Sequence, residues 1–114
     1  MKIYLANITS LEVGYLQGKY GQMGWLLSPQ SFPHRLRHFM PMAFDNDAYS
    51  AYQNKTEWNE AAWLKMLEQM VERQVKPEWV LVPDVVGDKR RTLANFFCYR
   101  TYISKRGWPV AMAV

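Results

Sequence analysis

Apolar residues dominate five short stretches of the chain, which segments of mixed polarity separate. In the last three stretches nearly every position is apolar, as is typical of parallel strands buried on both faces. These three begin at residues 41, 79 and 109, a spacing usual for strand–helix–strand units. The predicted strands are Lys2–Ala6, Trp25–Leu27, Pro41–Asp45, Trp79–Val82 and Pro109–Val114.

The clearest predicted helix lies between the third and fourth strands. Thr56 is a suitable N-cap, and the apolar periodicity continues to about Gln74. The residues that recur every three or four positions, and so predict one buried face, are Trp63, Leu64, Leu67, Met70 and Val71.

Two further helices are expected. Asp88 is a suitable N-cap for a helix over 89–105, and Gly107 suits its end. Its predicted inner residues are Leu93, Phe96, Phe97, Ile103 and, as a small core residue, Cys98. A short helix to about Phe39 is predicted after Ser28, because Pro29 suits the first helical position.

Together these elements predict an α/β fold with mainly parallel strands in a single domain, residues 1–114. Fourteen Lys and Arg against ten Asp and Glu give a net charge of +4, which is compatible with nucleic acid. One cysteine excludes an internal disulfide, and no apolar run approaches the roughly 20 residues of a membrane span. A cytoplasmic protein with no membrane contact is therefore expected.

Two predicted strands end in carboxylates, Asp45 in the third and Asp84 directly after the fourth. The carboxyl ends of parallel strands share one edge of the sheet, where ligands bind in such folds. Paired carboxylates at that edge can bind the edge of a base or transfer protons. The alternative is that each aspartate serves only a turn.

Other polar clusters carry weaker signals. His34 and His38 have a zinc-like spacing, but Arg35 and Arg37 alternate with them and no third ligand is evident, so neither a metal nor another cofactor is expected. These arginines predict a basic face that contacts phosphate. A second basic cluster predicted to bind nucleic acid is Lys89, Arg90 and Arg91.

Two segments resemble the first half of tRNA-guanine transglycosylase-like barrels. They are Met42-Ala43-Phe44-Asp45-Asn46-Asp47-Ala48-Tyr49 and Trp79-Val80-Leu81-Val82-Pro83-Asp84-Val85-Val86-Gly87-Asp88. The resemblance is closer to the branch that inserts 7-deazaguanines into DNA in bacteria and phages, and it covers about residues 40–114.

The resemblance implies a partial (β/α) barrel, since a complete one needs about 250 residues. It places Asp45 as the catalytic acid/base and Asp84 as the group that recognises the guanine-like edge, with Asn46 and Asp47 beside them in the substrate-binding segment. Asp47 replaces the family's usual glycine. The family's nucleophilic aspartate belongs to the second half of the barrel and has no counterpart here.

Three interpretations follow. The chain is a guanine- or 7-deazaguanine-binding half-barrel, not catalytic alone, that a second copy or a protein partner completes. Alternatively, it is a non-enzymatic phage-type protein that inhibits a host nucleic-acid-targeting defence complex, in the manner of an anti-CRISPR protein. The third is that the sequence belongs to a longer barrel chain.

Overall fold

The structure is a computed structural model that describes residues 3–6, 23–32 and 41–113. Within these ranges five strands form one sheet, and every neighbouring pair is parallel. Each predicted apolar stretch overlaps one of them, and β2 begins two residues earlier than predicted. The strands are β1 (Ile3–Ala6), β2 (Met23–Leu27), β3 (Met42–Phe44), β4 (Val80–Leu81) and β5 (Val110–Ala111).

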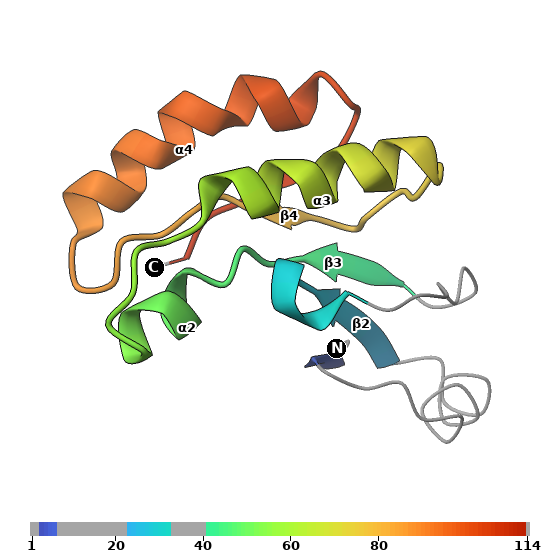
Figure 1. Cartoon of the computed structure of the whole chain (residues 1–114). Helices are drawn as coiled ribbons and strands as arrows, with labels where there is room; N and C mark the ends of the chain where they lie inside the picture. The colour runs from blue at the N-terminus through green and yellow to red at the C-terminus, as the bar shows by residue number, and fades with distance from the viewer. Residues whose placement is uncertain (1–2, 7–22, 33–40, 114) are drawn as a thin grey trace.

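The order of strands in the sheet follows the order in the chain. A doubly wound sheet reverses its order and carries helices on both faces. Here α3 (Glu60–Glu72) and α4 (Lys89–Ser104) lie on the same side of the sheet (Figure 1). The structure confirms an α/β fold with parallel strands. The predicted half-barrel is not confirmed, because the sheet is open.

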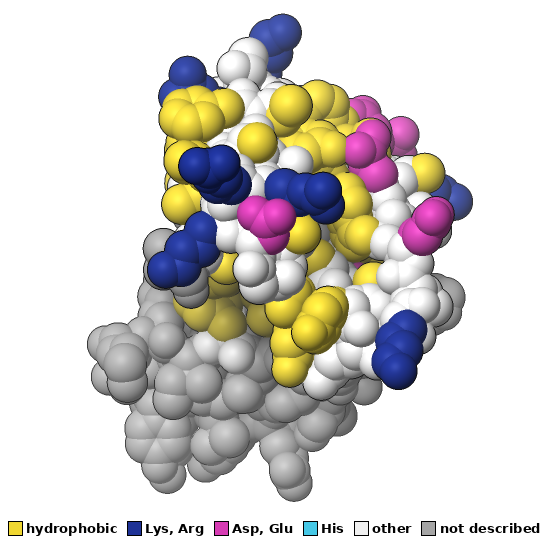
Figure 2. All heavy atoms as spheres, turned by 90° about the vertical axis from the view of Figure 1, so that its left-hand side faces the viewer, with side chains coloured by type: hydrophobic (Ala, Val, Ile, Leu, Met, Phe, Trp, Pro, Cys, Tyr) yellow, Lys and Arg dark blue, Asp and Glu magenta, His cyan; other side chains and the backbone are white. Residues whose placement is uncertain are grey.

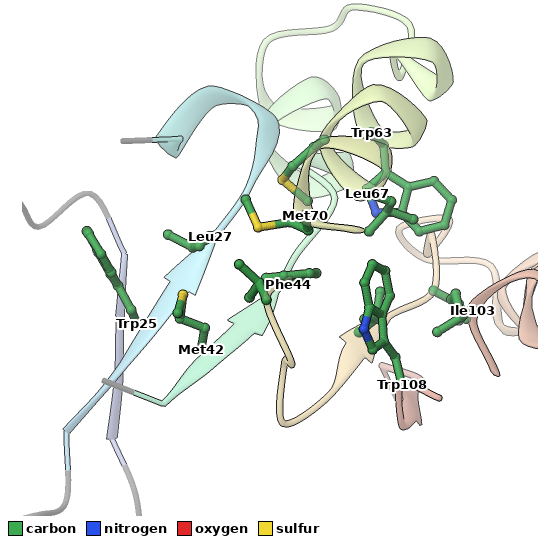
Figure 3. Packing of buried hydrophobic residues seen from close by; sticks show 13 residues of the cluster. Trp25, Leu27, Met42, Phe44, Trp63, Leu67, Met70, Ile103 and Trp108 are labelled. Atoms are coloured by element: carbon green, nitrogen blue, oxygen red, sulfur yellow. The ribbon is translucent and has the colours of Figure 1, made fainter. Parts of the chain in front are cut away.

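The core lies between α3 and one face of the sheet (Figure 3). Trp25 and Leu27 of β2 are in register with Met42 and Phe44 of β3, and Phe44 is in register with Val80, so these side chains share that face. The residues that cover them from the helices are Trp63, Met66, Leu67 and Met70 of α3 and Ile103 of α4.

The opposite face of the sheet carries the intervening residues, among them Gly24, Ala43 and Leu81. Tyr4 of β1 is in register with Gly24, and a Cβ at Gly24 would lie 2.6 Å from the Tyr4 ring. The ring therefore lies over Gly24. It reaches Trp79, at 5.3 Å between ring centroids, and its hydroxyl donates to the Glu78 carboxylate. A polar and aromatic bridge thus crosses this face from β1 to the start of β4.

The predicted start of α4 is confirmed, whereas that of α3 is wrong. Asp88 accepts the backbone N–H of Arg91 at 3.0 Å, as an N-cap does. In α3 the capping residue is Asn59, which accepts the N–H of Ala62 at 2.9 Å, and not Thr56. The N–H of Thr56 instead donates to the carbonyl of Ala51, because a helix that the sequence did not predict precedes it.

That unpredicted helix is α2 (Ala48–Gln53), in which only Ala48 is buried, so it lacks an apolar period. The end of α3 also falls earlier than expected, at Glu72, because Gln74 takes a positive φ of 57°. Gly107 has a positive φ of 77° shortly after α4, as its predicted role in helix termination requires.

The helix predicted from Ser28 to Phe39 is wrong at Phe32. A single 3₁₀ turn, η1 (Pro29–Ser31), forms, and Phe32 is already extended at φ −99° and ψ 113°. Pro33 follows Phe32, and a residue before proline is disfavoured in the helical region. The rest of that prediction lies outside the described residues.

Four predicted core residues are exposed instead: Val71, Leu93, Phe97 and Cys98. The inner side of α4 consists of Thr92 and Ile103, with Phe96, Tyr99 and Tyr102 partly buried. Because apolar and aromatic residues occur all round this helix, their spacing alone did not identify which side is buried. No helix in the described parts of the chain is long and apolar enough to cross a membrane.

Candidate functional site

Asp45 and Asp84 lie at the carboxyl ends of neighbouring strands, as the sequence predicted. Asp45 directly follows β3, and its N–H donates to the carbonyl of Leu27 at 2.7 Å, so it still pairs with β2. Since side chains alternate along a strand, Asp45 belongs with Ala43 to the face of the sheet away from α3. Asp84 is half-buried three residues beyond β4.

The environment of Asp45 raises the pKa of its carboxyl. Burial raises the pKa of the Asp45 carboxyl above its ordinary value, and the negative charges of Asp47 and Asp84 raise it further. A hydrogen bond from the N–H of Asn46 to Oδ1, at 2.7 Å, acts in the opposite direction and only partly offsets the burial. The structure therefore places the charges of Asp47 and Asp84 close enough to Asp45 to act on its carboxyl.

A cavity of about 210 Å³ opens beside Asp45. It lies between the ends of β2 and β3, the turn η1 and the start of α2. Its lining consists of Leu26, Ser28, Gln30, Ser31, Asp45, Asp47 and Ser50. Asp84 is not part of this lining; it follows β4, the strand next to β3.

Asn46 joins the ends of two strands. It is almost fully buried, and its Nδ2 donates to the carbonyls of Leu81 and Val82 at 3.2 and 3.1 Å. Its Oδ1 accepts the N–H of Ala48 at 2.9 Å, which starts α2, and its own carbonyl accepts the indole N–H of Trp58 at 2.7 Å. The side chain of Asn46 thus holds in place the backbone that directly follows Asp45.

Asp47 connects the cavity wall to η1. Its Oδ2 accepts the backbone N–H of Gln30 at 2.8 Å. Its φ and ψ of 64° and 17° place it in the left-handed region, which aspartate tolerates better than most residues. The family that this segment resembles usually has glycine at this position. The backbone of Asp47 indeed adopts a conformation that favours glycine.

The segment that carries Asp84 is anchored by α4. Asn95 Nδ2 donates to the carbonyl of Pro83 at 2.9 Å, and the N–H of Val85 donates to the Thr92 hydroxyl at 2.9 Å. Neither Thr92, Asn95 nor Trp58 was predicted to support the site. The one feature of the sequence that could have identified such a residue is a polar side chain on the inner side of a helix, as Thr92 is.

The predicted basic residues fall in two groups. Lys89, Arg90 and Arg91 are exposed at the start of α4, and Arg91 Nε lies 3.5 Å from Asp88 Oδ2. Arg35 and Arg37, with His34 and His38, lie outside the described residues. Within residues 3–6, 23–32 and 41–113, no group of three or more His, Cys, Asp or Glu side chains is arranged to hold a metal ion.

Comparison of the chain with family models, curated proteins and solved structures finds no match.

Proposed function

We propose that the chain is a half-barrel that binds a guanine or 7-deazaguanine base at Asp45 and Asp84. The observation that carries this proposal is the half-buried Asp45, with its raised pKa, beside a second carboxylate at the carboxyl edge of a parallel sheet. Perturbed carboxylates grouped at such an edge are characteristic of functional sites.

The two carboxyl groups suit complementary parts of the base. The Watson–Crick edge of guanine carries N–H groups, and the carboxylate of Asp84 can accept hydrogen bonds from them. O6 of the base is instead an acceptor. The raised pKa of Asp45 extends to higher pH the range in which its carboxyl is protonated and can donate to such an acceptor. The adjoining cavity, about 210 Å³, is smaller than the roughly 300–1,000 Å³ of sites for drug-sized ligands, which suits a single base.

The sheet itself supports a barrel-like arrangement. Its order never reverses, and Asp45 lies on the face away from α3, which in a barrel is the interior. On a flat sheet β1 and β4 would be about 14 Å apart, three strand spacings. The contact between the rings of Tyr4 and Trp79 across this face favours a sheet that curves toward it.

In this proposal Asp45 serves proton transfer to the leaving base, Asn46 positions Asp45, and Asp47 shapes the cavity wall. Base exchange also needs a nucleophile for the sugar carbon, which a second copy or a protein partner that completes the barrel supplies. The outer strand β5 provides an edge for such an addition. Lys89, Arg90 and Arg91 contribute phosphate contacts if the base arrives within a nucleic acid.

Calorimetric titration of the full chain with guanine and 7-deazaguanine tests the proposal, with adenine as the control base. Binding of the two guanine-like bases and a loss of at least tenfold in Asp84→Asn support it. Glu72→Gln, which removes an exposed carboxylate at the end of α3, is the matched control and leaves affinity unchanged. Equal binding of adenine, or undiminished binding by Asp84→Asn, contradicts the proposal.

A further inference from the structure

The outer side of α4 presents a stripe of which only Arg90 has a role in the proposed phosphate contacts. Arg90, Leu93, Phe97 and Arg100 follow one another at three, four and three residues, the spacing of a single helix face. All four are exposed: 45% of Leu93 and 56% of Phe97 are accessible to solvent. The stripe therefore has two large apolar side chains in its middle and a cation at each end.

Positive charge predominates on this surface. No Asp or Glu occurs in the sequence from Lys89 to Val114. Asp88 caps the first turn of α4 and lies beside Arg91. The α3 carboxylates Glu60 and Glu68 accept from Tyr99 and Tyr102 on the inner side of the helix. Figure 2 shows hydrophobic side chains among Lys and Arg on the face that includes the start of α4.

We propose that the stripe Arg90–Leu93–Phe97–Arg100 is the docking site for an acidic amphipathic helix of a partner protein. Leu93 and Phe97 are one turn apart and present an apolar anchor of the kind that a helix seats against. Carboxylates that flank the apolar residues of the partner complement Arg90 and Arg100. This surface lies on the helix layer, so the inference does not depend on the base site.

The geometry disfavours a nucleic acid on the same stripe. Proteins that bind single strands present aromatic faces on which bases stack. The guanidinium of Arg100 lies 4.9 Å from the Phe97 ring centroid and covers one face, and Phe96 meets the same ring at 77°. Leu93 has no aromatic face. The anchor therefore fits aliphatic and aromatic side chains of a protein better than bases.

Selection from a displayed library of 18-residue helical peptides against the full chain tests this proposal. The expected winners combine an apolar pair one turn apart with flanking Glu or Asp. Their affinity for Phe97→Ala and for Arg100→Glu falls at least tenfold. Tyr52→Ala removes an equally exposed aromatic side chain on α2 and is the matched control, which binds the selected peptides as the original protein does.

Other outcomes overturn the proposal. They are a selection without enrichment, winners that lack acidic residues, and winners that bind Phe97→Ala and Arg100→Glu undiminished. Displacement of the winners by a single-stranded oligonucleotide, whose binding also falls in Phe97→Ala, would assign the stripe to nucleic acid. Light scattering that shows self-association lost in Phe97→Ala would assign it to a second copy.

Discussion

The side-chain amide of Asn46 donates to the carbonyl of Val82 at 3.1 Å and so ties the end of β3 to the end of β4. The same amide group also reaches the carbonyl of Leu81, and Oδ1 accepts the N–H of Ala48. Every one of these partners belongs to the backbone. A single buried side chain therefore holds two strand ends and the start of α2 in place.

Replacement of Asn46 by alanine is expected to lower the free energy of unfolding by about 2–4 kcal/mol. The reason is that buried backbone groups lose their partners, which costs more than the net value of the bonds themselves. Chemical denaturation measures the change. Asn54→Ala, at an exposed position, is the control and should cost no more than about 0.5 kcal/mol; an equal loss in both would contradict the role assigned to Asn46.

The raised pKa of Asp45 predicts a pH-dependent cost to stability. The folded state holds the proton more tightly than the unfolded state. Protonated Asp45 therefore contributes stability that is fully present below the ordinary pKa of 3.8 and is lost as the pH rises through the folded pKa. Asp45→Asn stays neutral at every pH. Its free energy of unfolding should exceed that of the original protein at pH 7, and the difference should shrink toward about pH 4.

Thermal or denaturant unfolding at a series of pH values measures this difference. Asparagine retains an oxygen that can accept the N–H of Asn46, so the comparison isolates the charge. A difference that grows as the pH falls would show that ionised Asp45 stabilises the fold, contrary to the burial described above.

Coupling between the two strand-end carboxylates predicts that Asp84→Asn lowers the pKa of Asp45. The charge of Asp84 raises that pKa, but burial is the largest cause, so the pKa should stay above its ordinary value in the variant. Carbon-13 NMR of the Asp45 carboxyl across the acid range measures both effects. Glu72→Gln is the control, and an identical titration of Asp45 in Asp84→Asn would show that the two carboxylates are not coupled.

The sequence predicted what depends on neighbours in the chain. Asp88 was identified as a cap because its partner, the N–H of Arg91, lies three residues away. Asp45 and Asp84 were predicted to share an edge because parallel strands end on the same side. By contrast, the bracing role of Asn46 depends on carbonyls 35 and 36 residues further along the chain, which no local pattern indicates.

Dependence on partners far away in the sequence also explains why the buried side of α4 was predicted wrongly. Leu93 and Phe97 have the spacing of a buried face, yet the side that packs inward contains Thr92, Tyr99 and Ile103. Tyr99 and Tyr102 pack inward because their hydroxyls find Glu60 and Glu68 on α3. Periodicity shows that a helix has faces, but the partners that select the buried face come from other elements.

Two leucines on neighbouring helices give a direct test of this assignment. Leu67 of α3 is fully buried, whereas Leu93 of α4 is exposed. Leu67→Ala should lower the free energy of unfolding by about 2–5 kcal/mol, and Leu93→Ala should change it by no more than about 0.5 kcal/mol. Denaturation of the two variants side by side measures both, and a large loss in Leu93→Ala would mean that α4 buries the opposite face.

The bridge over the far face of the sheet predicts a change in the titration of Tyr4. Burial, together with the hydrogen bond to the Glu78 carboxylate, raises the pKa of Tyr4 to about 12. In Gly24→Ala the new Cβ would lie 2.6 Å from the ring, so the ring must leave Gly24 and with it Trp79 and Glu78. The pKa of Tyr4 should then fall toward 10.0, as NMR of ring-labelled tyrosine measures, with Tyr4→Phe to assign the signal.

Tyr99, whose pKa of about 12 comes from burial and a hydrogen bond to Glu60, is the internal control, and its pKa should not change. A Tyr4 pKa that stays near 12 in Gly24→Ala would show that the ring does not depend on the space that glycine leaves.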